Sequence, residues 1–77
     1  MEEERDVIVL ISPDRREKVC IYQRAEGSFG SRNFIWVTEE PYFEGWTIGR
    51  EWGHFYDTPR TALRECAATF SWIGEYL

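Results

Sequence analysis

The chain has 77 residues, which is enough for one domain and too few for a large hydrophobic core. Fourteen Asp and Glu residues outnumber nine Lys and Arg residues and give a formal net charge of −5. This charge argues against non-specific binding to nucleic acid or to an anionic membrane, because both need a surplus of cations next to phosphate. It suits a protein whose partner is another protein, in particular a basic one.

The start of the chain and its cysteines predict a cytoplasmic protein. Residues 1–4 (MEEE) are acidic where a secretory signal peptide is first cationic and then apolar. The longest apolar run, residues 7–11, is much too short to cross a bilayer. Two cysteines, Cys20 and Cys66, are fewer than a small secreted scaffold usually carries, so we expect both thiols to be reduced and buried.

The first part of the chain predicts a β-hairpin. Residues 1–6 are polar and acidic and are expected to form a flexible lead-in to a single domain over residues 7–77. The β-branched run Val7–Ile11 predicts a strand that is buried on both faces or lies in the middle of a sheet. A Pro- and Asp-containing turn over 12–16 leads into a second strand over 18–23. Alternation gives this strand two faces, one with Val19, Ile21 and Gln23 and the other with Lys18, Cys20 and Tyr22.

The middle of the chain predicts a long loop followed by further strands. Residues 25–33 are rich in Gly and Ser and are expected to be irregular. Phe29 lies within this loop, either as a plug that attaches the loop to the core or as an exposed anchor for a partner. Strands are expected over 34–38 and within 42–48, and a short last strand over 54–56 after a glycine-containing turn.

The C-terminal part of the chain predicts one helix. Asp57-Thr58-Pro59 supplies a capping side chain followed by proline at the first helical position. Apolar residues then recur at helical spacing: Leu63, Cys66, Ala67, Phe70, Ile73 and Leu77. Gly74 is expected to weaken or end the helix. Together these elements predict an α+β fold, an antiparallel β-meander of four to five strands with one C-terminal helix packed on one face.

The sequence carries no pattern typical of catalysis or of metal binding. His54, Asp57 and Cys66 suggest a thiol nucleophile, but Cys66 belongs to the apolar stripe of the helix and is expected to face the core, where a thiol is inert. The glutamates within residues 39–44 are interpreted as a solvated acidic loop, because the spacing of a calcium loop is missing. We therefore expect no metal, no cofactor and no enzymatic activity.

Aromatic residues are concentrated between Phe34 and Tyr56. Nine aromatic side chains, one histidine included, lie in this segment, and a domain of this size has little interior to hide them. Alternation sends part of them towards the helix, with Ile35, Val37, Ile48 and Phe55 as expected companions. The others are expected on the open face or in loops. The candidate interface comprises Phe29, Trp36, Tyr42, Trp46, Arg50 and Trp52.

A pattern in the second half of the chain is similar to that of a known group of small domains. Gly45-Trp46-Thr47-Ile48 is followed by residues 53–58 (GHFYDT) and then by Ala62 and Ala67. This order resembles the amino-terminal arm-binding domains of phage integrases and the DNA-binding domains of plant ethylene-response factors. Those domains are a sheet followed by a helix, and their sheet reads DNA through exposed Arg and Trp side chains. The resemblance implies the same fold and gives that role to Trp46, Arg50 and Trp52.

Two functions follow from these observations. The first is a small acidic non-enzymatic module that binds and regulates a protein partner or a second copy of itself, by analogy with phage and mobile-element proteins that occupy basic nucleic-acid-binding sites. The alternative is a nucleic-acid-binding domain whose sheet face stacks tryptophans on bases and sets Arg15, Arg16, Arg32 and Arg50 against phosphates. The acidic charge disfavours this alternative.

Overall fold

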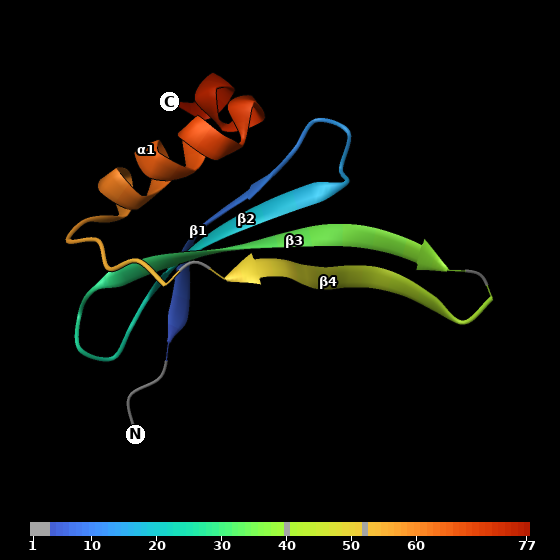
Figure 1. Ribbon diagram of the computed structural model, residues 1–77, viewed down its shortest axis with the longest axis horizontal. Helices are drawn as coiled ribbons and strands as arrows, with labels where there is room; N and C mark the ends of the chain where they lie inside the picture. The colour runs from blue at the N-terminus through green and yellow to red at the C-terminus, as the bar shows by residue number, and fades with distance from the viewer. Residues whose placement is uncertain (1–3, 40, 52) are drawn as a thin grey trace.

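The computed structural model describes residues 4–39, 41–51 and 53–77 and has the predicted α+β fold (Figure 1). In these residues four antiparallel strands form one sheet in the order β1-β2-β3-β4. The strands are β1 (Arg5–Ile11), β2 (Glu17–Gln23), β3 (Phe29–Glu39) and β4 (Phe43–Glu51). They are followed by helix α1 (Pro59–Thr69) and a short 3₁₀ helix, η1 (Ser71–Tyr76).

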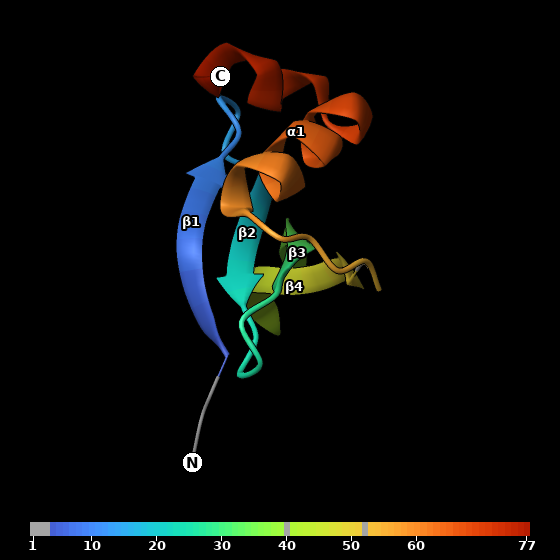
Figure 2. The same cartoon turned by 90° about the vertical axis from the view of Figure 1, so that its left-hand side faces the viewer.

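The core lies at one end of the sheet, where α1 and η1 pack on β1, β2 and the first part of β3 (Figures 1 and 2). Its fully enclosed residues come from β2, α1 and η1: Val19, Ile21, Ala62, Cys66 and Ile73. The hairpin of β3 and β4 extends beyond the helical layer, and Figure 2 shows β4 turned well away from the direction of β1 by the twist of the sheet. Half of this hairpin therefore lacks a second layer.

The predicted helix start is confirmed, but the helix ends earlier than Gly74. The Thr58 hydroxyl accepts a hydrogen bond from the Thr61 N–H at 3.1 Å, and Pro59 opens the first turn. The helix stops at Thr69 because Phe70 adopts an extended backbone, after which η1 brings Ile73 into the core. This change of helix type breaks the 3.6-residue period, and Leu77, expected on the apolar stripe, is exposed instead.

Strand β1 is an edge strand, so the prediction that it is buried on both faces or lies mid-sheet is wrong. It begins at Arg5, two residues earlier than predicted. Ile8 and Leu10 pack against the core, whereas Val9 on the other face is 49 % exposed. The outer face of this strand is apolar like its core face, so the apolar run is continuous although only one of the two faces is covered.

The middle of the chain is more regular than predicted. Strand β3 begins at Phe29, so residues 29–33 are strand and not loop. Strand β4 continues to Glu51, so residues 49–51, expected in the glycine-containing turn over 49–53, are strand. The expected strand over 54–56 is reduced to one bridge, in which Tyr56 and Phe29 exchange backbone hydrogen bonds of 2.8 and 2.9 Å.

Candidate functional site

The sheet has a face that no described helix covers, on the side opposite α1. Residues paired across antiparallel strands point to the same face, so the register defines this surface. We call it the open face, and its main residues are Val9, Ile11, Lys18, Cys20, Tyr22, Arg32, Phe34, Trp36, Trp46 and Ile48.

Cationic side chains lie over aromatic rings at the centre of the open face. The Lys18 Nζ is 4.7 Å from the centroid of the Phe34 ring and 4.9 Å from that of Trp46. The Arg32 guanidinium carbon is 3.9 Å from the centroid of Tyr22, a side chain that is only 1 % exposed. The aliphatic stems of these cations help to cover the sheet while their charges stay at the surface.

Two of the tryptophans that the sequence places on the open face or in loops lie side by side on the open face. Trp36 and Trp46 are register partners, with ring centroids 5.2 Å apart and ring planes at 80°. The Trp36 N–H donates a 2.8 Å hydrogen bond to the Arg16 carbonyl, which ties β3 to the turn between β1 and β2. The two rings form a wall of a concavity of about 490 Å³ beside that turn.

The other candidate interface residues are not part of this cluster. Tyr42 lies in the turn between β3 and β4 and is 88 % exposed. Phe29 is half-buried against the core, so it acts as the plug and not as an exposed anchor. Trp52 lies outside the described residues.

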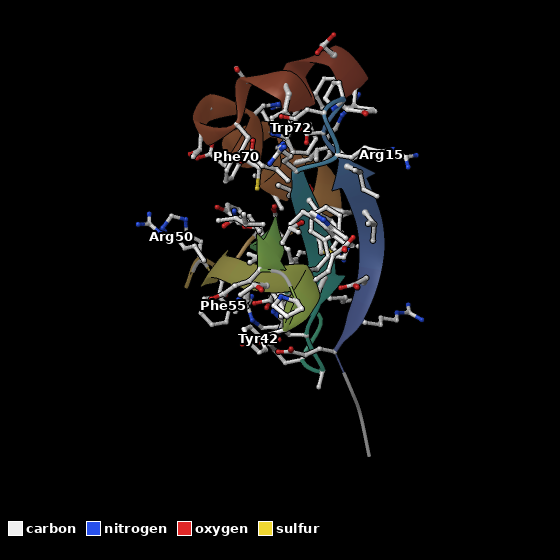
Figure 3. The ribbon with its side chains drawn as sticks, turned by 90° about the vertical axis from the view of Figure 1, so that its right-hand side faces the viewer. Arg15, Tyr42, Arg50, Phe55, Phe70 and Trp72 are labelled. Atoms are coloured by element: carbon white, nitrogen blue, oxygen red, sulfur yellow. The ribbon has the colours of Figure 1, made fainter. Side chains whose placement is uncertain are left out.

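Arg50 lies on the helix-covered side of the sheet and not beside Trp46. It pairs with the buried Asn33, and Figure 3 shows Arg50 and Arg15 pointing to opposite sides of the molecule. The register between β3 and β4 shifts at Gly49, which leaves two residues of β4 on the same side of the sheet. In a strand with regular alternation Arg50 would share a face with Trp46. The bulge moves Arg50 to the opposite face.

Two of the predicted core companions lie outside the core. Ile48 pairs with Phe34 on the open face and is 51 % exposed. Phe55 is 68 % exposed, with the Arg24 guanidinium carbon 4.1 Å from its ring centroid. Ile35 is on the helix side as expected but remains 45 % exposed, because it lines an open groove with Thr69 and Phe70.

Sequence reasoning missed Lys18, Phe34 and Ile11 as members of this surface. The alternation in β2 already placed Lys18 opposite the core-facing Val19 and Ile21. The missing information was the register, since only pairing across strands shows that Lys18 is next to Phe34 and that Ile11 is next to Lys18.

Cys66 and His54 line one small cavity of about 170 Å³, together with Tyr56. The His54 Nδ1 is 2.9 Å from the Tyr56 hydroxyl, and Asp57 does not line the cavity. Burial raises the pKa of the Cys66 thiol, so it is protonated at neutral pH and lacks the thiolate that a nucleophile needs. We therefore assign no catalysis to this cavity. Within the described ranges, no group of three or more His, Cys, Asp or Glu side chains is placed to hold a metal.

The fold and the open face together define a small α+β domain with one uncovered sheet surface. No helix in the described part of the chain is long and apolar enough to cross a membrane. Comparisons with protein-family models, with curated proteins and with solved structures found no match to this chain. The resemblance to integrase arm-binding and ethylene-response-factor domains accordingly stays a prediction.

Proposed function

We propose that this protein is a small non-enzymatic interaction and regulatory module that binds a protein partner through its open face. The observation that carries the proposal is the Trp36–Trp46 pair, which lies on an uncovered sheet surface and is flanked by the exposed side chains of Ile11 and Ile48. Aromatic side chains with aliphatic neighbours are the usual centre of a protein–protein interface.

The charges around the open face support a protein partner over a polyanion. Lys18 and Arg32 are accompanied on this face by acidic residues, because Glu44 pairs with Thr38 and Asp6 pairs with Tyr22. Arg32 also forms an ion pair with Glu4. A rim of mixed charge suits a protein surface, whereas a nucleic acid requires a surplus of cations.

Partner capture with paired variants tests this function. The tagged protein would be used as bait in an extract of its own host, as wild type, as W36A/W46A and as R60Q/R64Q, which changes two exposed positions on α1. We expect a protein that co-elutes with wild type and R60Q/R64Q and is reduced at least tenfold with W36A/W46A. Retention by a W36A/W46A variant whose circular dichroism matches wild type would contradict the proposal. Light scattering after size exclusion identifies a second copy as the partner.

A nucleic-acid-binding domain is the second candidate. It is favoured by Lys18 and Arg32, whose charges lie against aromatic rings on one face, an arrangement that serves stacking and backbone contacts in single-strand binders. Fluorescence anisotropy with a labelled single-stranded oligonucleotide at low salt measures this directly. Binding that W36A/W46A abolishes would favour this function, and absence of binding at low salt would exclude it.

A further inference from the structure

The concavity beside the turn between β1 and β2 has apolar walls and a cationic rim. Its apolar walls are Ile11, Trp36 and Trp46, and its rim carries the exposed side chains of Arg15 and Arg16. Its volume of about 490 Å³ lies within the range of ~300–1,000 Å³ that is typical of ligand sites. One large apolar side chain fits against the walls while a neighbouring group of the same ligand reaches the rim.

The turn that carries the rim is fixed by hydrogen bonds. The Ser12 N–H donates to the Glu17 carbonyl at 2.9 Å, and the Arg15 N–H donates to the Ser12 carbonyl at 2.9 Å. The Arg16 carbonyl then accepts from the Trp36 N–H. Because the backbone of both arginines is fixed relative to Trp36, a ligand that contacts all three orders little of the protein on binding.

The rim attracts anions. No described residue forms a hydrogen bond or an ion pair with the Arg15 guanidinium. Asp14 also lines the pocket, and its carboxylate accepts hydrogen bonds from the Ser12 hydroxyl at 2.6 Å and from the Arg16 N–H at 3.0 Å. These bonds, together with the positive charge of Arg16, lower the pKa of Asp14. The Asp14 carboxylate is engaged within the turn and stays charged, so it offsets part of the charge of the two guanidinium groups and leaves the rim with a net positive charge.

We propose that this pocket binds an acidic peptide segment of the partner, with one apolar side chain against Trp36, Trp46 and Ile11 and adjacent carboxylates on Arg15 and Arg16. Guanidinium groups pair with carboxylates through two parallel hydrogen bonds, which gives the charged part of the site its selectivity. This inference rests on the proposed function and specifies the chemistry of its partner, which at this pocket is acidic although the net charge of the whole chain suits a basic partner.

A peptide fits this site better than a nucleic acid does. One or two carboxylates match the two arginines, and the rest of a peptide adds no charge. A nucleic acid continues with one phosphate per nucleotide, and these phosphates would pass Glu44, which neighbours the pocket residue Thr38, on a protein of net charge −5.

Three blocked octapeptides test the inference by ¹H–¹⁵N spectroscopy of the whole chain. Each has a central leucine, which is flanked by two glutamates, two glutamines or two lysines in a Gly/Ser background. We expect the glutamate peptide to shift the indole signals of Trp36 and Trp46 and the amide signals of Arg15 and Arg16 in a saturable way. Its affinity should exceed that of the lysine peptide at least tenfold, with the glutamine peptide between them.

Charge-matched variants assign the effect to the rim. R15Q/R16Q should bind the glutamate peptide no better than the glutamine peptide, whereas R60Q/R64Q, which removes two exposed arginines of α1, should bind it within twofold of wild type. Equal affinities for the three peptides, or no saturable shift, would overturn the inference. The inference would also be overturned if oligothymidylate shifted these signals at lower concentration than the glutamate peptide does.

The two experiments distinguish failure of the inference about the pocket from failure of the proposed function. If partner capture depends on Trp36 and Trp46 but the three peptides bind alike, the open face is the interface and the inferred partner chemistry is wrong. If W36A/W46A still captures the partner, the proposed function itself is wrong.

Discussion

Gly30 occupies a position where even one added carbon must displace its neighbours. It lies opposite Tyr22 in the sheet, and a Cβ at this site would be 2.5 Å from the Arg24 Nη2 and 2.7 Å from the Tyr22 Cζ. Tyr22 is buried, and the Arg24 guanidinium is held by the Tyr22 hydroxyl at 3.0 Å and by the Phe29 carbonyl at 3.1 Å. We expect Gly30→Ala to lower the free energy of unfolding by about 1–3 kcal/mol in urea titrations.

Gly53→Ala is the matched control for this substitution. A Cβ at Gly53 would meet nothing within 4 Å, and Gly53 is exposed. The expected change in unfolding free energy is within about 0.5 kcal/mol. Equal losses at Gly30 and Gly53 would show that crowding beside Tyr22 is not the cause.

The two buried thiols make stability sensitive to alkaline pH. Burial raises the pKa of Cys20 and of Cys66 above the ordinary value of 9.0. Above that value the unfolded chain loses these protons while the folded chain keeps them. The contribution of the two protonated thiols to the free energy of unfolding is therefore fully present below this pH and is lost as the pH rises further. We expect the urea midpoint to fall as the pH rises above about 9.

A C20A/C66A variant separates the thiols from the other groups that titrate in this range. Its urea midpoint at neutral pH should be lower than that of wild type, because two buried side chains are shortened. Its decline with rising pH should nevertheless be shallower. A decline as steep as that of wild type would assign the effect to other residues, among them Tyr56, whose pKa burial also raises.

At the scale of elements, both ends of the free β1 edge are modified. Val7 is an extra residue in the register with β2, which bends the strand. At the other end the Ser12 N–H bonds to β2, so the preceding carbonyl of Ile11 points outwards, and the Tyr76 hydroxyl donates a 2.9 Å hydrogen bond to it. Only the short stretch around Val9 stays open, which limits pairing with another chain.

Tyr76→Phe tests this protection by η1. The substitution keeps the ring and frees the Ile11 carbonyl at the sheet edge, so we expect a loss of about 1 kcal/mol in unfolding free energy. Light scattering should also show more self-association at high concentration. Tyr42→Phe, at an exposed site in the β3–β4 turn, should change neither quantity. Unchanged association of Tyr76→Phe would indicate that the bulge at Val7 suffices.

The sequence predicted those elements whose signals are local. The cap at Thr58 and the alternation of β2 depend on a few neighbouring residues, and both agree with the structure. The edge position of β1 and the bulge at Gly49 depend on pairing between strands, which no short segment encodes. The expectation that Trp36 and Trp46 lie on the open face or in loops agrees with the structure, whereas Arg50, to which the resemblance gives the exposed face, lies one residue beyond the bulge on the helix side.

At the scale of the whole molecule, the candidate interface lies partly on the β3–β4 hairpin, a single layer of sheet that extends beyond the two-layered core. The molecule measures 41 × 34 × 17 Å, and the enclosed residues gather where α1 and η1 cover the sheet. The β3–β4 hairpin has large exposed side chains even on the helix side of the sheet, among them Phe43 and Ile35. Few buried apolar contacts hold this part of the sheet, so it should open more often than β2 does.

Hydrogen exchange measures this difference and its response to a partner. In the isolated protein the amides of β2 should exchange slowest, and those of residues 42–47 should exchange faster. Saturation with the glutamate peptide should slow exchange around Trp36 and Trp46 and in the turn that carries Arg15 and Arg16, and should leave α1 unchanged, because no residue of α1 lines the pocket. Protection spread evenly over α1 and β2 would instead indicate general stabilisation of the fold. If exchange in the isolated protein is as slow in residues 42–47 as in β2, the β3–β4 hairpin is not the weakly supported part of the sheet.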